Sequence, residues 1–309
     1  SINDFNNIYI YTSDEDKYLI QDVIENYLFD FTYHTPVPEK KYNPIWKNAQ
    51  EFLAKPDHPN MMVISIDEYS DSTVDLIGDF FNSKINNNEN ITLIKDYFNK
   101  NQNLFFLKYD NNDSLMIDLT LKKKWILNEI KRNDFSKIKK YSFRGGLNDS
   151  IATFLKDRFH IDINIQEDYQ VIRSDIDDKY VWMGRGFPYR WILIFEDESR
   201  FYETINQIWK RLADRVDSLI DIELINYMPQ FETVSSDIDS YFKVYGTYGT
   251  KAGSENFTGG PLIGHIYNYS NSNNSLIAIG FVNYPGNNKV FHIKELEYIL
   301  ETIKIKERN

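Results

Sequence analysis

The hydrophobic and polar positions form their clearest pattern near the end of the chain. Residues 261–269 and 276–284 are both rich in apolar and aromatic residues, and the segment 270–275 between them consists only of Ser and Asn. Two such runs joined by a short polar loop predict an antiparallel hairpin. A Pro-Gly pair then ends the second strand. The apolar residues of Val290–Ile303 recur at spacings of three and four, which predicts a helix.

The same patterns predict short strands and helices in the rest of the chain. The expected strands are Asn7–Tyr11, Met61–Ile66, Leu104–Tyr109, Leu115–Leu121, Ile161–Ile165, Tyr169–Arg173, Tyr180–Met183, Trp191–Phe195, Ile222–Asn226 and Tyr241–Tyr248. The expected helices are one that Ser13 caps, Ile45–Leu53, Val74–Phe81, Ile91–Phe98, Lys122–Ile138, Ser150–Phe159 and Arg200–Ile220.

The order of these elements predicts an α+β fold with mainly antiparallel sheets and flanking helices. A second hairpin is expected where the polar turn Asp110–Asp113 joins Leu104–Tyr109 to Leu115–Leu121. Both halves of the chain mix short strands, helices and hairpins. We therefore expect two similar α+β halves, residues 1–140 and 141–309, and the pattern leaves open whether they share one sheet.

Composition narrows the classes of function. The chain has 309 residues, and 42% of them are hydrophobic, which is enough to bury a core. Its net charge of −11 argues against nonspecific binding to nucleic acid, because phosphates require cationic side chains. The sequence contains no Cys, which excludes disulfides and thiolate catalysis in this chain. It shows neither a signal segment nor a long apolar run, so we expect it to be soluble as given.

No standard catalytic or cofactor-binding motif occurs in the sequence. The five His residues are scattered, and no pair at a spacing of four would place two imidazoles on one helix face. The acidic segments 174–178 and 236–240 lack the Gly and final Glu of calcium loops. The sequence therefore predicts no catalytic residue, no metal and no cofactor.

A cluster of Trp and Arg around the loop 184–190 is the strongest candidate for a binding site. Trp182 and Trp191 flank this loop, and Arg185 and Arg190 lie within it. Trp and Arg are enriched at binding hot spots. In a second interpretation, the Trp residues belong to the core and the Arg residues pair with acidic side chains. Both interpretations stay open.

The pair Gly259-Gly260 also has two interpretations. Two consecutive Gly residues before Pro261 favour a turn. They would also allow a backbone to approach a ligand closely, because neither residue has a side chain.

Several motifs resemble a known family. TGGPL (258–262), GFVNYP (280–285) and KELEYIL (294–300) are similar to the closing motifs of the domain-of-unknown-function 4837 family. KYVWMGRG (179–186) and NYM (226–228) are similar to motifs that precede them. The family's Arg-Gly-Leu-Trp motif corresponds here to VYGT, which lacks both the Arg and the Trp.

The resemblance implies an exported lipoprotein of the Bacteroidetes cell envelope, in the periplasm or on the outer surface. It implies membrane attachment only through an N-terminal lipid anchor upstream of this chain. If its motifs converge on one groove, then Tyr227, Gly259 and Gly260 join the Trp and Arg cluster as candidate site residues. We expect a non-enzymatic module that binds an envelope protein or a glycan. A hydrolase with a carboxylate and Arg site, and a structural component of an envelope assembly, are the alternatives.

Overall fold

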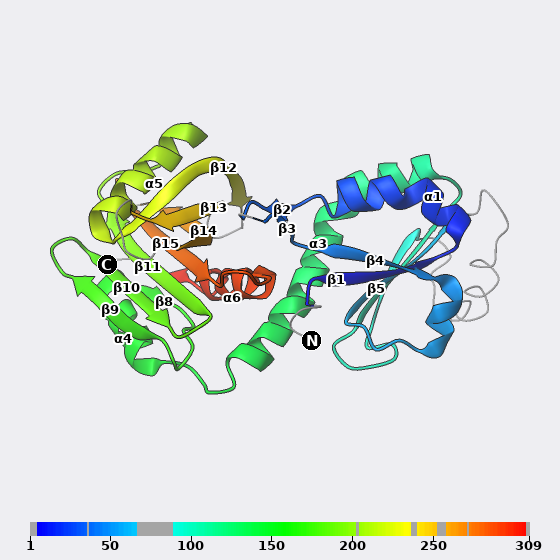
Figure 1. The fold of residues 1–309 in the computed structure, drawn as a ribbon, viewed down its shortest axis with the longest axis horizontal. Helices are drawn as coiled ribbons and strands as arrows, with labels where there is room; N and C mark the ends of the chain where they lie inside the picture. Colours follow the sequence, from blue (N-terminus) through cyan, green and yellow to red (C-terminus); the bar gives the residue numbers. More distant parts are fainter. Residues whose placement is uncertain are drawn as a thin grey trace. The chain divides into compact units, whose positions relative to one another are not determined.

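The chain divides into two compact units (Figure 1). The first comprises Ser1–Phe31 and Lys40–Lys137, and the second comprises Thr32–Glu39 and Ile138–Asn309. The boundary falls within helix α3 (Asn112–Ser142). The computed structural model describes residues 5–35, 37–66, 89–201, 204–235, 240–251, 258–270 and 272–306.

The first unit contains a five-stranded sheet with the order β4-β1-β5-β7-β6. Its strands are β1 (Asn7–Thr12), β4 (Asn43–Asn48), β5 (Asn60–Ile66), β6 (Ile91–Lys95) and β7 (Asn103–Tyr109). The pairs among β4, β1, β5 and β7 are parallel, and only β6 runs antiparallel to its neighbour. Two-residue strands β2 (Thr32–Tyr33) and β3 (Glu39–Lys40) lie near the unit boundary in the sequence.

Helices of the first unit begin where local hydrogen bonds support them. The predicted cap is confirmed, because the Ser13 hydroxyl accepts a hydrogen bond from the Asp16 amide at 3.0 Å. Helix α1 (Asp14–Val23) then continues into a π-helical turn, Ile24–Leu28. A 3-10 helix, Ala49–Ala54, follows β4.

The sequence-based assignment is wrong at three places in this unit. Leu115–Leu121 belongs to α3 and does not form a hairpin with β7, because Leu115 and Leu119 begin a helical stripe that is buried against the sheet. Residues 45–48 are in strand β4, and residues 91–95 form strand β6 instead of a helix. The predicted helix Val74–Phe81 lies outside the described residues.

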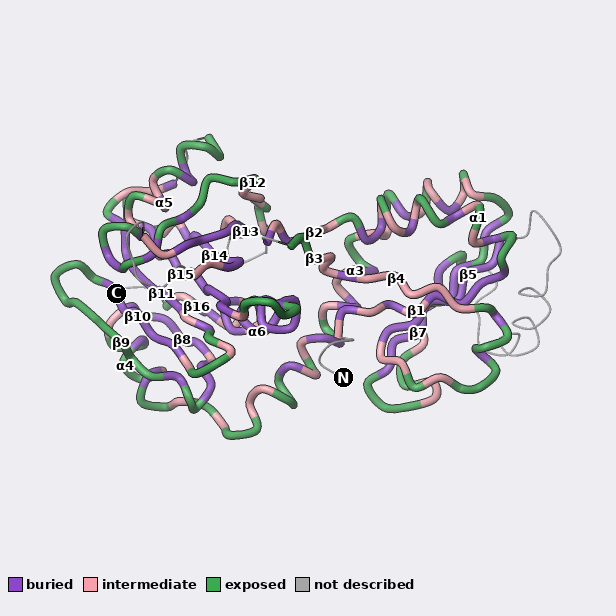
Figure 2. The backbone as a smooth tube through the Cα atoms, in the orientation of Figure 1, coloured by how far each residue is buried: buried purple, intermediate pink, exposed green. Residues whose placement is uncertain are grey.

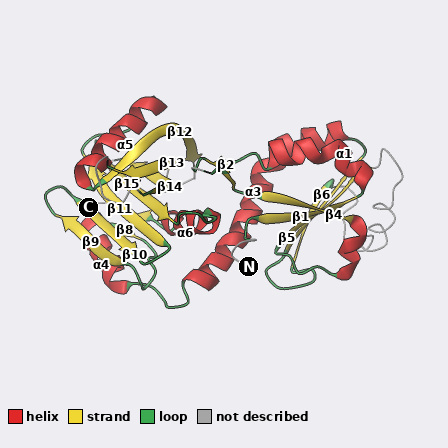
Figure 3. Cartoon of the chain, in the orientation of Figure 1, coloured by secondary structure: helices red, strands yellow, loops and turns green. Residues whose placement is uncertain are grey.

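The second unit contains a seven-stranded antiparallel sheet with the order β12-β13-β14-β15-β11-β10-β9 (Figure 3). Its strands are β9 (Gln170–Asp175), β10 (Tyr180–Arg185), β11 (Tyr189–Asp197), β12 (Ile222–Ser235), β13 (Ser240–Thr250), β14 (Gly259–Asn268) and β15 (Ser275–Asn283). The α+β class is therefore confirmed, with one mainly parallel and one antiparallel sheet.

Helices cover both faces of this second sheet. The amphipathic helix α5 (Ile205–Leu219) packs its buried residues, Trp209 among them, against one face. Helix α6 (Val290–Glu301) packs against β14 and β15 on the other face, where Leu296 lies over Gly280. The remaining elements are α4 (Asp149–Phe159) and the paired strands β8 (Ile161–Asp162) and β16 (Lys304–Ile305).

The hairpin and helix predicted for the end of the chain are confirmed as β14, β15 and α6. Both strands are buried along most of their length, whereas the whole of the edge strand β9 is exposed (Figure 2). Within the described part of the chain, no helix has both the length and the apolar character required to cross a membrane.

Candidate ligand-binding pocket

The Trp and Arg cluster predicted from the sequence is divided between the two faces of the second sheet. In the β10–β11 hairpin, Gly184 lies opposite Trp191 and Arg185 lies opposite Arg190. Successive residues of a strand point to opposite faces. Trp182 and Trp191 therefore share the face that α5 covers, and the two Arg side chains point to the face that α6 covers.

Both Arg side chains are engaged in ion pairs. Arg190 Nε lies 2.9 Å from Glu295 Oε2, and both side chains are almost fully buried. Arg185 lies 3.6 Å from the other Glu295 oxygen and also pairs with Asp168. The structure thus shows the second of the two interpretations for these Arg residues, in which they pair with acidic side chains.

The pKa of Glu295 reflects this arrangement. Burial disfavours the charged carboxylate, but a hydrogen bond with His292 and the charges of Arg190 and Arg185 outweigh it. Together they lower the pKa of Glu295 to about 2. Gln166 Nε2 adds a hydrogen bond of 2.8 Å to Glu295 Oε1. The cluster thus ties α6 to β10 and β11 through a charged carboxylate.

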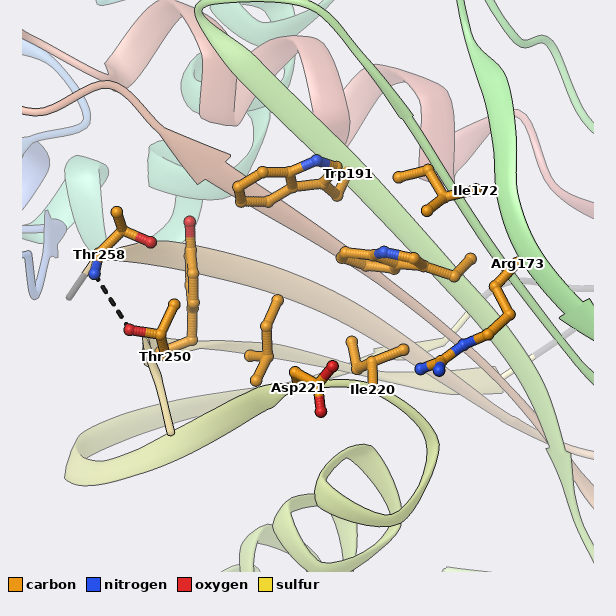
Figure 4. Close-up of a pocket in the computed structure, with 10 residues that line it drawn as sticks. Ile172, Arg173, Trp191, Ile220, Asp221, Thr250 and Thr258 are labelled. Carbon is orange, nitrogen blue, oxygen red and sulfur yellow. Dashed lines mark hydrogen bonds between the residues drawn. The ribbon is translucent and has the colours of Figure 1, made fainter. Parts of the chain in front are cut away.

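A pocket of about 390 Å³ opens on the other face, beside the two Trp residues (Figure 4). Its volume falls within the range of small-molecule sites, roughly 300–1,000 Å³. The lining residues come from strands β9, β10, β11 and β13, from the connection before β12 and the start of that strand, and from the residue before β14. They are Ile172, Arg173, Trp182, Trp191, Ile220, Asp221, Ile222, Tyr248, Thr250 and Thr258.

Aromatic rings form one wall of this pocket. The rings of Trp182 and Trp191 are 5.9 Å apart, with an interplanar angle of 32°. Tyr248 meets Trp191 edge to face, with the ring centroids 6.3 Å apart. The Tyr248 hydroxyl donates a hydrogen bond of 3.0 Å to the Val282 carbonyl. This bond fixes the ring orientation, so the wall is formed before any ligand arrives.

Polar groups stand opposite the aromatic wall. Arg173 Nη2 donates a hydrogen bond of 2.7 Å to the Leu219 carbonyl, which joins edge strand β9 to the end of α5. Asp221 is exposed and lies in the connection that follows α5. In Figure 4 the Arg173 and Asp221 side chains both reach the lower side of the pocket, and Thr250 accepts a hydrogen bond from the Thr258 amide at 3.1 Å. The pocket thus presents one cation, one anion and hydroxyl groups.

A β-bulge shapes the β9 side of the pocket. Trp182 pairs with Arg173, but the next residue, Met183, pairs with Val171. Ile172 is therefore an extra residue in β9. A bulge places two successive side chains on one side of a strand, which explains why both Ile172 and Arg173 line the pocket.

Two glycines of the candidate set lie next to Tyr248, which lines the pocket. A Cβ on Gly260 would lie 2.1 Å from the Val282 carbonyl oxygen and 3.3 Å from the Tyr248 ring. A Cβ on Gly259 would lie 2.6 Å from the Tyr248 carbonyl oxygen. Both residues are within β14 and not in a turn. The close approach that they allow is between neighbouring strands of the sheet.

Tyr227 lies elsewhere in the second unit. It belongs to an irregular part of β12, where the pairing jumps from Ile225 to Gln230. Its ring is largely exposed and meets His34 edge to face. It does not line the pocket that Trp182 and Trp191 share.

Most of the polar lining could not be predicted from the sequence. Arg173, Asp221, Thr250 and Thr258 stand in no recognisable motif, and only the folded sheet brings them together. Tyr248 ends the predicted strand Tyr241–Tyr248, and Thr250 lies beyond it. Nothing in the sequence indicated that these residues would share a pocket with residues of β9.

Gly184 is expected to position Trp191, because the indole lies directly over it. A Cβ at this position would stand 2.3 Å from Trp191 Cδ1 and 3.2 Å from Ile172 Cδ1. We expect Gly184→Ala to displace the indole and to lower the free energy of unfolding by about 1–3 kcal/mol, as overpacking does. Near-ultraviolet circular dichroism and urea unfolding measure both effects.

Gly186→Ala is the matched control for this substitution. It lies in the same hairpin, and a Cβ there would meet nothing within 4 Å. We expect its stability and its aromatic dichroism to match those of the wild type. Equal behaviour of the two alanine variants would contradict the role assigned to Gly184.

Comparisons with known proteins identify a family but supply no activity. A family model described as "Domain of unknown function (DUF4837)" matches residues 148–302, which contain every residue of the pocket. No curated protein matches the chain.

Distant similarity to solved structures covers about half of the chain. A Saccharomyces cerevisiae Ran-binding protein, Mog1p, is 10% identical over 47% of this chain and 89% of its own, with a TM-score of 0.33. A protein from Bacteroides thetaiotaomicron is 12% identical over 48% of this chain and 45% of its own, with a TM-score of 0.27. Similarity at this level carries no inference about function.

Proposed function

This chain belongs to the DUF4837 family, a domain of unknown function, and from the site that its second unit carries we propose a non-enzymatic module that binds a neutral glycan. The pocket beside Trp182 and Trp191 holds one sugar ring of that glycan. We further propose that the protein acts at the cell envelope, as a lipid-anchored exported protein, because its motifs resemble those of envelope lipoproteins.

The observation that carries this proposal is an aromatic wall with polar side chains opposite it. A sugar ring has faces of C–H groups and a rim of hydroxyls. The negative faces of Trp182 and Trp191 attract the C–H groups. Arg173 donates hydrogen bonds, Asp221 accepts them, and hydroxyl side chains do both. A few fixed polar groups in a mostly apolar pocket are typical of small-molecule recognition.

The charges of the pocket favour an uncharged ligand. Arg173 and Asp221 contribute opposite charges, so neither sign dominates the lining. The chain as a whole carries a net charge of −11, which would repel an acidic polymer. A neutral sugar can form hydrogen bonds with both side chains through its hydroxyls and adds no charge of its own.

The same lining argues for binding over hydrolysis. Glycoside hydrolysis ordinarily uses two carboxyl groups on either side of the bond that breaks. Of the described residues that line the pocket, Asp221 supplies the one carboxylate. Glu295, the acid whose pKa is strongly lowered, is a residue of α6 and lies on the other face of the sheet. A pocket that orients a sugar without a pair of acids supports recognition.

Isothermal titration calorimetry of the full chain tests the proposal. The probes are tetrasaccharides of β-1,4-linked glucose, α-1,6-linked mannose and β-1,4-linked N-acetylglucosamine. We expect at least one to bind. Trp191→Ala should weaken that binding at least tenfold, because a buried aromatic anchor dominates an interface. Analysis of the mixtures for new reducing ends separates binding from hydrolysis.

Trp125→Ala provides a matched control, because Trp125 is a partly exposed indole on α3 in the first unit. It should leave the affinity unchanged. Failure of all three probes to bind the wild type would overturn the proposal. New reducing ends would instead indicate a hydrolase. Equal affinities of the Trp191→Ala variant and the wild type would show that the sugar does not bind in this pocket.

A further inference from the structure

We infer that the binding site continues beyond the pocket to Tyr189, and that the ligand is an oligosaccharide chain of which at least two rings are bound. This inference rests on the proposed function and specifies its ligand further. The first ring occupies the pocket beside Trp191, and the next ring lies on Tyr189 near the β10–β11 turn.

A continuous row of aromatic rings leads out of the pocket. Tyr189 and Trp191 are two residues apart in β11 and therefore lie on one face of the sheet. Their rings are stacked, with centroids 5.6 Å apart and an interplanar angle of 6°. Trp191 in turn lies 5.9 Å from Trp182 inside the pocket. The row thus begins in the pocket and ends at the turn.

The outer end of this row is open to solvent. Tyr189 is 43% exposed and Phe187 is 61% exposed, although both rings are large and apolar. Single exposed apolar residues are ordinary, whereas contiguous ones next to a pocket indicate an interaction surface. Tyr189 is also contiguous with Trp191, so a ligand seated against Trp191 has this surface as its nearest extension.

Neighbouring rings hold Tyr189 in place. The Phe187 ring meets the Tyr189 ring edge to face, with the centroids 5.6 Å apart, and its centroid lies 5.4 Å from that of Tyr284. The backbone of Tyr189 pairs with Asn283 in β15. A ring that is fixed before binding loses little conformational entropy when a ligand packs on it. Tyr189 therefore offers a prepared apolar face and a hydroxyl to a second sugar.

The surroundings of Tyr189 suit a neutral sugar chain. The charged side chains next to it in the hairpin, Arg185 and Arg190, point to the opposite face and pair with Glu295. The surface between the pocket and the turn is therefore aromatic. Stacking on aromatic faces recognises the apolar face of each sugar and needs no ionic group on the ligand.

A length series tests this inference separately from the proposed function. The monosaccharide and the tetrasaccharide of each of the three sugars are titrated into the wild type, Tyr189→Ala, Tyr189→Phe and Trp191→Ala. In the series that binds, we expect the wild type to prefer the tetrasaccharide at least tenfold. Tyr189→Ala should reduce that preference below threefold, while Tyr189→Phe should retain it.

The outcomes distinguish failure of the second subsite from failure of the proposed function. A wild type that binds both lengths equally, or a Tyr189→Ala variant with full preference for the tetrasaccharide, overturns the second subsite and leaves the pocket intact. Trp191→Ala should weaken both lengths. No binding of any sugar overturns both proposals.

Tyr18→Ala, at a highly exposed Tyr on α1, is the control for loss of an aromatic side chain. Phe187→Ala replaces Tyr189→Ala if the latter does not fold, and should also reduce the preference.

Discussion

Replacing Glu295 with alanine is expected to lower the free energy of unfolding of the second unit by about 3–5 kcal/mol, the usual result of removing one partner of a buried ion pair. Arg190 is 5% exposed and its Nε lies 2.9 Å from the Glu295 carboxylate. Without that carboxylate, the guanidinium stays buried with its charge uncompensated. Urea unfolding of the full chain, followed by circular dichroism, measures the loss.

A double substitution separates charge from packing. Arg190→Met together with Glu295→Met removes both charges and keeps most of the volume. Replacement of a buried pair by apolar residues is often neutral or stabilising, so we expect the double variant to be more stable than Glu295→Ala. Equal losses of stability in both variants would mean that packing, and not the ion pair, holds α6 in place.

The same carboxylate makes stability depend on pH. Its pKa in the folded protein is about 2, against an ordinary value of 4.5. The stabilisation is therefore complete above pH 4.5 and disappears as the pH falls toward 2. The difference corresponds to roughly 3 kcal/mol, at about 1.4 kcal/mol for each pH unit. Unfolding midpoints measured from pH 2 to pH 6 should rise in the wild type, and this part of the rise should vanish in the double variant.

Lys243→Met is expected to destabilise the second unit by a similar amount. The Lys243 ammonium lies 3.0 Å from Glu297 and 2.8 Å from Glu301, both on α6. Burial lowers the pKa of Lys243, but the two carboxylates outweigh it and hold that pKa well above its ordinary value. Methionine fills the same space without the charge, and the buried Glu297 loses its lysine partner. We expect a loss of about 3–5 kcal/mol at pH 7 in urea unfolding.

A second substitution provides the check on Lys243, because Glu297→Gln removes the charge that the Lys243→Met variant leaves uncompensated. Adding Glu297→Gln should restore much of the loss at pH 7, which a double-mutant cycle measures as coupling. Strictly additive losses would show that the lysine and the carboxylate act independently.

Long periodic runs allowed a good prediction of the second unit. The Ser and Asn loop between two apolar runs, followed by a helical stripe, defined β14, β15 and α6 without ambiguity. The first unit was harder because its runs are short. Leu115–Leu121 fits a strand or a helix equally well, and only the packing of Leu115 and Leu119 on the sheet selects the helix.

The candidate site was predictable by residue type but not by face. Trp182 and Trp191 stood out because Trp is rare and favours contact surfaces, and both line the pocket. Arg185 and Arg190 were grouped with them because they are close in sequence. The register of one hairpin sends these Arg residues to the opposite face, and that register depends on the geometry of the turn.

The opposite wall of the pocket depends on long-range structure. Strands β9 and β12 are at opposite ends of the strand order, yet the Arg173 side chain reaches the Leu219 carbonyl just before β12. No local sequence pattern predicts that these two segments come together. A sequence shows which residues suit a site, whereas the curvature of the sheet determines which of them meet.

The extra residue in β9 has a consequence for how such a site changes over generations. Ile172 stands between two correctly paired positions of an edge strand. A deletion of this codon would leave Arg173 opposite Trp182 and Val171 opposite Met183, with every other strand unaltered. The Ile172 side chain that lines the pocket can therefore be lost or regained in a single mutational event. The lining of the pocket can change in this way while the rest of the scaffold is inherited unchanged.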